Sequence, residues 1–355
     1  MKKRISGIIL AMVMSITLIT SNISVAFAGQ IPNEVIDTTQ VTNPEEIISV
    51  IIELEKKPVL DCSQAQELGA EAYLSSDAAA AAREKLLGRQ MAVQKAILEK
   101  INAEALFSSH YTNTINGFSA IVKRGDIPKI KALKEVKSIY ADESYKAPES
   151  KMEPKLMSST DMIGATNVWN VKGYKGEGTV VAVIDTGVDV YHEYMVVDVD
   201  TEVELTKESI ATVIANYELN ASDLRTGLTS DDVYYNRKFP FCFDYADDDT
   251  DVAPRAGDSH GVQIAGVIAA NGTVAKATKD NLHTTLEFNG VAPEAQIIGM
   301  KVFPDKGGEA STSAIIAAVE DATTIGADVI NVSLGSPAGF TFLEGLDLSL
   351  NILLQ

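Results

Sequence analysis

Cysteine is scarce in this sequence, with only Cys62 and Cys242 among 355 residues. Two cysteines this far apart do not make the disulfide framework that stabilises many small secreted domains. They also lack the Cys/His spacing that is typical of structural zinc sites. We therefore interpret both as small, buried apolar residues.

Basic residues are few relative to acidic ones: 30 Lys and Arg stand against 49 Asp and Glu, which gives a formal net charge of −19. A chain without an excess of positive charge cannot neutralise many phosphates, so we exclude nucleic acid as a partner. Long apolar runs are missing beyond the N-terminal segment, so no later stretch is expected to span a membrane.

Residues 1–28 are typical of a secretory signal peptide. Three basic residues near the start precede an apolar run from Ile8 to Ile19, and the small-residue pattern Ala26-Phe27-Ala28 follows. A membrane anchor is the alternative, but the run is short and is broken by Ser15 and Thr17. We therefore expect a secreted protein, extracellular or associated with the cell envelope, with no membrane span after cleavage of the signal.

Residues 46–145 show the order strand, helix, strand, strand, helix, strand. In this ferredoxin-like α+β arrangement two helices cover one face of an antiparallel sheet, and the other face needs a separate cover. We expect strands at 47–54, 106–111, 117–122 and 136–140, and helices at 78–103 and 127–133. In a secreted precursor the following domain can supply the cover, so residues 29–150 are a candidate pro-region, with a polar linker at 145–155.

From residue 179 onward, short β-rich runs alternate with helical ones, which predicts an α/β domain with a parallel sheet in residues 151–355. The expected strands lie at 180–184, 296–302 and 328–334, and the expected helices at 259–270 and 311–325. An insertion at about 195–258 separates the first strand from the first long helix, and it ends in an acidic run from Asp244 to Asp251.

Two residues of the second domain are candidates for catalysis. Asp185 follows the apolar strand at 180–184, at the carboxyl edge where α/β proteins place their active sites. His260 lies at the start of a predicted helix, whose positive N-terminal end favours the neutral imidazole that a general base requires. Other interpretations stay open: Asp185-Thr186-Gly187 also occurs in aspartic proteases and in plain turns, and a histidine in this position is also typical of a cap or a surface.

Together these residues resemble the Asp and His of the subtilisin-like serine proteases (subtilases, peptidase S8 family), whose triad runs Asp, His, Ser along the chain. Residues Asn289 to Val302 resemble the family segment after the histidine helix, and Asp328 to Gly335 resemble its substrate-lining strand. Residues 47–142, especially Asn116 to Ala120, resemble an inhibitor I9-type propeptide. The run Asp244 to Asp249 is similar to that of lactocepin-type cell-envelope proteinases. The resemblance implies the N-terminal part of a subtilisin-like parallel-sheet domain behind a small propeptide domain.

The resemblance also implies a serine endopeptidase precursor that hydrolyses peptide bonds of extracellular proteins and is inhibited by its own propeptide. Asp185 would hold the imidazole of His260, which would take the proton from an attacking serine hydroxyl. Two edges would hold an extended peptide by backbone hydrogen bonds. One edge consists of Gly307, Gly308, Glu309 and Ala310, and the other of Ser333, Leu334 and Gly335.

The sequence departs from the family pattern in two places. Gln263 stands where the family usually has a second histidine, which concerns the packing of the helix start and not the chemistry. The family's Gly-Thr-Ser nucleophile segment and its oxyanion Asn do not occur before Gln355, and we interpret Ser311 and Ser313 as helix caps. We therefore expect the chain to be truncated before the catalytic serine and inactive alone.

Two further functions stay open. A non-catalytic truncated product could act through its pro-region as a protease inhibitor or folding chaperone. A cell-surface binding module that uses the acidic insertion ranks last, because the sequence shows no anchor.

The acidic run from Asp244 to Asp251 has two interpretations. Oxygen-rich loops can bind calcium, and the family often carries structural calcium sites. We favour a solvated loop, because the alternating Asp/Asn pattern with its Gly is missing. We therefore expect no required cofactor and assign no metal ligand, with calcium possible as a structural ion. His192 is expected to be structural.

Overall fold

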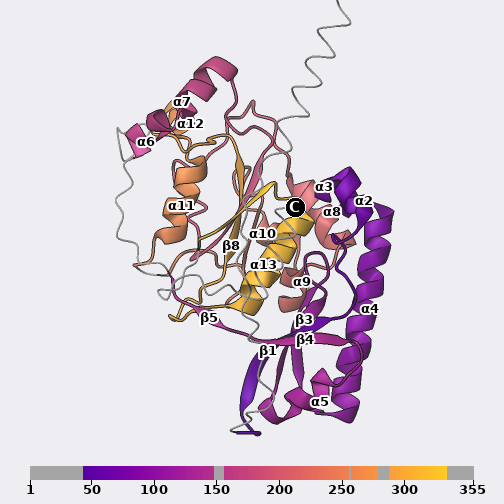
Figure 1. Ribbon diagram of the computed structural model, residues 1–355. Coiled ribbons are helices and arrows are strands. Elements are labelled where there is room, and N and C mark those ends of the chain that lie inside the picture. The colour runs from indigo at the N-terminus through magenta and orange to yellow at the C-terminus, as the bar shows by residue number, and fades with distance from the viewer. Residues whose placement is uncertain (1–42, 148–155, 256, 279–287, 334–355) are drawn as a thin grey trace, which may run out of the picture. The chain divides into compact units, whose positions relative to one another are not determined.

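The computed structural model of the chain describes residues 43–147, 156–255, 257–278 and 288–333. The predicted signal peptide lies outside these residues. Two four-stranded sheets form, an antiparallel one near the start of the described part and a parallel one after it (Figure 1). No helix within the described ranges is both long and apolar enough to cross a membrane.

The antiparallel sheet has the strand order β2-β3-β1-β4. Its strands are β1 (Ile47–Leu54), β2 (Leu106–Tyr111), β3 (Gly117–Lys123) and β4 (Val136–Ala141). The two predicted helices are α4 (Asp77–Lys100) and α5 (Ile127–Lys131), and a 3-10 turn at Arg124–Asp126 precedes the second one. The α+β unit therefore has the predicted order of strands and long helices.

Two short helices, α2 (Ser63–Leu68) and α3 (Ala70–Leu74), precede α4 and are not among the predicted elements. Each has one or two turns, so its sequence carries too little periodicity to reveal it. The sulfur of Cys62 accepts a hydrogen bond from Ala65 N (3.4 Å) and caps α2. The interpretation as a buried apolar residue is thus right for Cys242 and wrong for Cys62, which is partly buried and serves as a cap; both thiols are free.

Both faces of the antiparallel sheet are covered. Ile97 of α4 and Phe118 of β3 belong to one buried cluster. Ile51 and Tyr111 belong to a different cluster, which they share with many residues of α13 (Thr312–Ile325) in the second domain. This confirms the prediction that the following domain covers the free face of the sheet.

The parallel sheet has the order β10-β6-β8-β7. Its strands are β6 (Val180–Asp185), β7 (Phe241–Asp244), β8 (Gln296–Lys301) and β10 (Val329–Val332). Helix α11 (His260–Ala269) packs on the face of β6 that carries Val183, and α13 packs on the face that carries Ile184. Because the strands are parallel, their carboxyl ends meet at one edge of the sheet.

Strand β7 lies inside the segment 195–258, which we expected to be an insertion, and it is not among the predicted strands. It pairs with β8 from Phe241↔Ile298 to Asp244↔Lys301, so this end of the segment belongs to the sheet. Before β7 the segment forms α8 (Lys207–Asn216), α9 (Asn220–Leu224) and α10 (Ser230–Val233). The other helices are α6 (Leu156–Met162), α7 (Ala165–Asn167), η2 (Val168–Lys172) and α12 (Gly272–Thr278).

A two-stranded antiparallel ladder joins β5 (Ser144–Tyr145) to β9 (Ala310–Ser311). Tyr145 was expected to begin a polar linker, but it is buried and belongs to the same cluster as α13. The polar residues after Tyr145 led us to place the start of the linker too early in the chain. An aromatic side chain can fill a buried site even where it borders a polar stretch.

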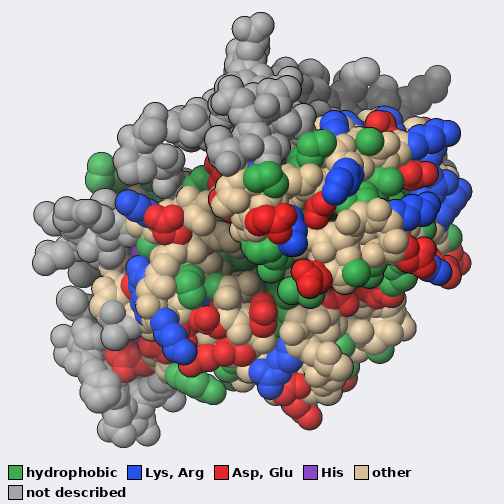
Figure 2. All heavy atoms as spheres, turned by 90° about the horizontal axis from the view of Figure 1, so that it is seen from below, with side chains coloured by type: hydrophobic (Ala, Val, Ile, Leu, Met, Phe, Trp, Pro, Cys, Tyr) green, Lys and Arg blue, Asp and Glu red, His purple; other side chains and the backbone are tan. Residues whose placement is uncertain are grey.

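Charged side chains of both signs occupy the surface drawn in Figure 2. Acidic side chains are spread over this face, and several lie near basic ones. On this face the charged side chains of the described residues are therefore mixed in sign and not gathered at one point.

Candidate active site

Asp185 ends β6, a strand whose six residues are all buried. Its side chain is fully buried, and its Oδ1 accepts a hydrogen bond from the backbone N–H of Thr186 (2.6 Å). Burial raises the pKa of Asp185, while the hydrogen bonds from His260 and Thr186 act in the opposite direction. A carboxylate in this position is costly unless hydrogen-bond donors surround it.

The ring of His260 supplies such a donor. Its Nδ1 lies 2.8 Å from Oδ1 and 2.9 Å from Oδ2 of Asp185, although the two residues are 75 positions apart. The side chain of His260 is 17% exposed, whereas that of Asp185 is 0% exposed. Since Nδ1 is directed to the carboxylate, Nε2 is the nitrogen that remains for a proton acceptor role.

Helix α11 positions this ring because its first turn lies directly against the end of β6. Gly261 N donates to the Oγ1 of Thr186 (3.1 Å). A Cβ on Gly261 would lie only 2.2 Å from the carbonyl oxygen of Gly187 and 3.1 Å from the Cβ of Asp185. Sequence reasoning did not select Gly261 or Thr186, although both lie beside residues that it did select.

Gln263, which stands in place of the family's second histidine, also lies in the first turn of α11. Its Nε2 donates to the Oγ of Ser259 (2.8 Å), the residue that immediately precedes the helix. The backbone N–H of His260 donates to Oδ1 of Asp258 (3.2 Å). Polar contacts therefore satisfy groups at the start of α11, the place where we expected the replacement of the family's second histidine by Gln263 to affect packing.

Of the residues predicted to hold a peptide, those that the structure describes follow the carboxyl ends of β8 and β10. Gly307 and Gly308 form an exposed turn with φ values of +82° and +148°, which favour glycine, and Glu309 is also exposed. Ala310 is buried and pairs with Tyr145. An antiparallel ladder with an extended segment is the geometry expected of a peptide-binding edge.

The second predicted edge is described only at its first residue. Ser333 follows β10, whose Val332 pairs with Ile184, so Ser333 comes at the level of Asp185. Its Oγ accepts a hydrogen bond from Nδ2 of Asn331 (2.8 Å). Leu334 and Gly335 lie outside the described residues.

The end of the predicted pro-region caps α13. Thr312 N donates to the carbonyl of Glu143 (2.9 Å), and Ser313 N donates to Oδ1 of Asp142 (2.8 Å). Ser313 Oγ donates to Oδ2 of the same Asp142 (2.7 Å), and Ser311 Oγ accepts from Ala314 N (3.2 Å). The predicted cap is thus confirmed for Ser311, and both serines are engaged at the helix start.

A buried carboxylate on α13 anchors a loop of the pro-region. The side chain of Glu320 accepts hydrogen bonds from the backbone N–H groups of Thr112 (3.0 Å), Asn113 (2.8 Å) and Thr114 (2.7 Å). The hydroxyl of Thr114 donates to the same carboxylate. Sequence analysis did not select Glu320, because a single glutamate in an apolar helix carries no motif.

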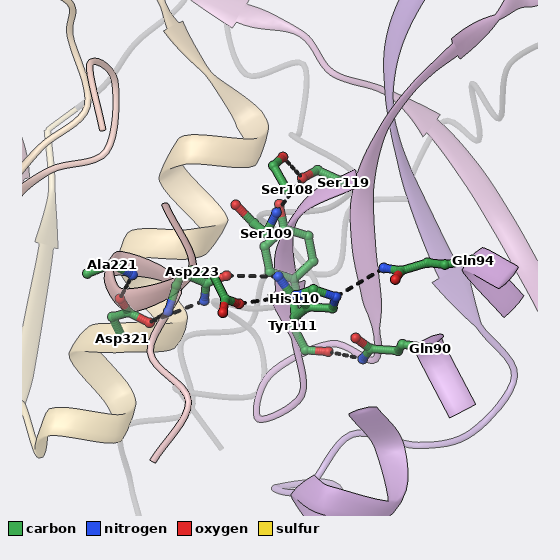
Figure 3. A network of polar contacts seen from close by, with 11 residues as sticks. Gln90, Gln94, Ser108, Ser109, His110, Tyr111, Ser119, Ala221, Asp223 and Asp321 are labelled. Atoms are coloured by element: carbon green, nitrogen blue, oxygen red, sulfur yellow. Dashed lines mark hydrogen bonds and ion pairs between the residues drawn. The ribbon is translucent and has the colours of Figure 1, made fainter. Parts of the chain in front are cut away.

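A second polar contact joins β2 of the pro-region to α9 (Figure 3). The backbone N–H of His110 donates to Oδ1 of Asn220 (2.9 Å), and its ring Nδ1 lies 3.1 Å from Oδ2 of Asp223. Ring Nε2 lies 3.0 Å from the amide nitrogen of Gln94 on α4. A neutral ring with the proton on Nδ1 donates to Asp223 and accepts from Gln94, so both contacts are satisfied.

Asp244, the first residue of the acidic run, ends β7 and is buried, whereas Asp247, Asp248 and Asp251 after it are exposed. The favoured interpretation as a solvated loop is therefore wrong for Asp244 only. Asp244 is fully buried, and Nζ of the fully buried Lys301 lies 2.7 Å from its Oδ2. Lys301 Nζ also contacts the carboxylate of Asp305. Burial raises the pKa of Asp244 to about 6, and the contact with Lys301 opposes that rise.

These residues do not fit a calcium site. Oxygens of Asp244, Asp247 and Asp305 lie within 4.8 Å of one another, but an ammonium group already lies among them. Calcium requires six to eight oxygen ligands. Here Oδ1 of Asp244 accepts from Ala246 N (2.8 Å) and Asp247 N (3.1 Å), and Oδ2 of Asp247 accepts from Asp305 N (2.7 Å).

Comparison with known proteins gives two family matches. The profile of the subtilase family matches residues 176–349, and that of peptidase inhibitor I9 matches residues 49–148. The PI-type proteinase of Lactococcus lactis subsp. cremoris is 36% identical over 268 residues, which are 75% of this chain and 13% of that protein. The minor extracellular protease Vpr of Bacillus subtilis (strain 168) is 29% identical over 305 residues, which are 81% of this chain and 30% of that protein.

The crystal structure of the epidermin leader peptide processing serine protease from Staphylococcus aureus superposes on this chain with a TM-score of 0.44 and 16% sequence identity. The match covers 87% of this chain and 56% of that protein's chain. Of the two curated relatives, the chain spans 13% of the length of the lactococcal proteinase and 30% of the length of the Bacillus protease.

Proposed function

The chain belongs to the subtilase family, with an I9 inhibitor domain ahead of the subtilase domain, and we propose that it is part of a secreted serine endopeptidase precursor. In this proposal residues 1–28 are the signal peptide, 29–150 the pro-region and 151–355 part of the catalytic domain. The observation that supports the proposal most strongly is the contact of His260 Nδ1 with both carboxylate oxygens of Asp185 (2.8 and 2.9 Å).

In the proposed mechanism Asp185 keeps the proton of His260 on Nδ1, so that Nε2 is free to act as the general base. Nε2 takes the proton of a serine hydroxyl while the oxygen attacks the peptide carbonyl, and it then gives the proton to the leaving amine. The buried carboxylate stabilises the imidazolium that forms in between. Ser311 and Ser313 are engaged at the start of α13, so we place the nucleophile outside the described residues.

The substrates are proposed to be extracellular proteins or peptides that bind in an extended conformation. The edge from Gly307 to Ala310 would pair with the substrate backbone, as Ala310 pairs with Tyr145 in this structure. Ser333, Leu334 and Gly335 are proposed as the opposite edge. No cofactor is assigned to the reaction, since each proposed step uses a side chain.

The pro-region is proposed to inhibit the enzyme by occupying the edge that substrates would use. Pairing of β5 with β9 and the contacts of Glu320 with the loop at 112–114 support this role. The chain by itself is proposed to be inactive, because the pro-region covers this edge and the nucleophile is not assigned among the residues described.

The test is peptide hydrolysis by the enzyme expressed from its complete gene. His260→Ala should lower kcat/KM by a factor on the order of 10⁴ to 10⁶, because the general base is lost. His192→Ala is the matched control: its Nδ1 accepts from Tyr194 N (3.1 Å), a structural contact, so turnover should change by less than about tenfold. Full activity of the His260 variant would refute the assignment.

A second candidate function is inhibition in trans by the pro-region. The buried contacts of Glu320 support this candidate, because they are hydrogen bonds from the loop at 112–114 to α13 that need no covalent link between the two parts. Purified residues 29–150 should slow a related subtilase at micromolar concentration, and circular dichroism of the same sample reports whether they are folded. A folded sample that gives no inhibition would exclude this candidate.

A further inference from the structure

Lys301 is a charged residue with no contact to solvent. Its side chain is 0% exposed. In the backbone register of the sheet, Lys301 ends β8 and stands between Asp185 of β6 on one side and Asp244 of β7 on the other. Its ammonium group has three oxygen partners: the carboxylates of Asp244 and Asp305 and the carbonyl of Asp251 (3.3 Å). Three acceptors match the three N–H donors of an ammonium group.

The partners of Lys301 come from two parts of the chain: β7 with the loop that follows it, and the turn after β8. Asp244 ends β7, Asp251 lies in the loop that follows it, and Asp305 lies in the turn after β8. Asp247 joins the same arrangement, because its Oδ2 accepts from Asp305 N (2.7 Å). One cation therefore connects the acidic run to the turn after β8.

That turn leads directly into the proposed substrate-binding edge. Gly307 N donates to the carbonyl of Pro304 (3.3 Å), and a Cβ on Gly308 would lie 2.9 Å from the ring of Pro304. Ala310, which pairs with Tyr145, follows two residues later. A displacement of Asp305 would thus be passed along a short, constrained segment to the edge.

We infer that Lys301 is the resident cation of this acidic cluster in place of calcium and that, through Asp305, it positions the edge from Gly307 to Ala310. The positioning role rests on the proposed function only in calling that segment a substrate-binding edge. A calcium ion sharing these carboxylates would lie beside an ammonium group that the fold cannot release to solvent, because the stem of Lys301 is buried.

The first experiment tests whether calcium binds to the acidic cluster around Lys301. The thermal midpoint of the intact chain is measured with calcium and with a chelator, for the wild type and for Asp247→Asn. We expect the same wild-type midpoint in both buffers. A calcium-dependent gain that persists in Asp247→Asn places the ion elsewhere and agrees with the inference, whereas a gain that this variant loses would overturn it.

The second experiment tests positioning, by hydrogen exchange of the intact chain in Asp305→Asn. This variant keeps the contact of Lys301 with Asp244 and removes only the carboxylate charge in the turn. Amides in the segment 305–311 and in β5 should exchange about tenfold faster. Exchange rates equal to those of the wild type would overturn the positioning role. Lys306→Met, an exposed lysine in the same turn, is the matched control and should leave these rates unchanged.

Enzyme kinetics separate this inference from the proposed function. In the active enzyme, Asp305→Asn should raise KM for a peptide about tenfold with little change in kcat, because it displaces an edge and not the catalytic pair. A loss in kcat alone would contradict the inference. If the enzyme expressed from the complete gene hydrolyses no peptide at all, the proposed function fails, while the calcium and exchange results on the intact chain still decide the role of Lys301.

Discussion

Tyr145 of the pro-region pairs with Ala310 in an antiparallel ladder, and Ser144 pairs with Ser311 in the same register. Tyr145 is 8% exposed, and its hydroxyl donates to Oε2 of Glu143 (2.9 Å). The pro-region therefore meets the second domain both through backbone pairing and through a buried aromatic side chain.

Replacement of Tyr145 by Ala should destabilise this contact. The variant loses a buried aromatic ring, so the free energy of unfolding should fall by about 3 to 5 kcal/mol if the site does not collapse. Lys146→Ala changes the next residue, which is exposed, and should stay within about 0.5 kcal/mol of the wild type. Chemical denaturation of both variants is the measurement; equal effects would show that Tyr145 contributes no packing.

Two glycines of α11 should respond in opposite directions to alanine. Gly261→Ala would place a Cβ 2.2 Å from the carbonyl oxygen of Gly187, so we expect a loss of at least about 2 kcal/mol and a displaced His260 ring. Gly266→Ala meets nothing within 4 Å, so helix propensity should raise stability by about 0.5 to 1 kcal/mol. Thermal unfolding and the ring resonances of His260 report these effects. A stable Gly261 variant would contradict the close approach.

Glu320→Gln should loosen the loop at 112–114 from α13. The neutral amide offers one acceptor oxygen where the carboxylate offers two, and hydrogen bonds to charged groups contribute about 1.5 to 3 kcal/mol. Amides of Thr112, Asn113 and Thr114 should therefore exchange roughly 10 to 100 times faster in the intact chain. Glu309→Gln, an exposed carboxylate, is the control. Unchanged exchange in the Glu320 variant would exclude the anchor role.

Asp321 should make stability depend on pH. Burial raises its pKa to about 7, although N–H groups of Asn220 and Ala221 and the hydroxyl of Tyr245 donate to it. A carboxyl whose pKa is higher in the folded state contributes stability that is fully present below its unfolded pKa of about 4 and is lost as pH rises through 7.

The comparison is with Asp321→Asn, which does not titrate and keeps one acceptor oxygen. Between pH 4 and pH 7 the wild type should lose up to about 4 kcal/mol of unfolding free energy relative to this variant. Denaturant unfolding at several pH values gives both curves. A difference that stays constant with pH would contradict the raised pKa.

Residues that form long, regular patterns could be predicted from the sequence. The β-branched runs at 47–54 and 180–184 gave their strands, and Asp185 and His260 were selected because each lies at the end or start of such an element. The contact between these two side chains then follows from the parallel sheet, which places the carboxyl end of β6 beside the start of α11.

Other features depend on contacts between distant parts of the chain. Strand β7 has only four residues, and it becomes a strand because β8 pairs with it. Lys301 is buried because Asp244 and Asp305 neutralise it, and no local pattern announces a lysine in that position. The burial of Asp244 could not be predicted for the same reason: the composition of the acidic run indicates solvation, although Asp244 itself is fully buried.

Adjacent residues of α13 face different segments: Glu320 holds the loop at 112–114, and Asp321 holds the start of α9. If the pro-region departs, the amides that surround Glu320 leave with it, and water must take their places, whereas the contacts of Asp321 remain. A competing polypeptide can regain this binding energy only with a tight turn whose amides converge on one carboxylate, so a substrate that bound along β9 in the proposed extended conformation would leave the Glu320 site hydrated.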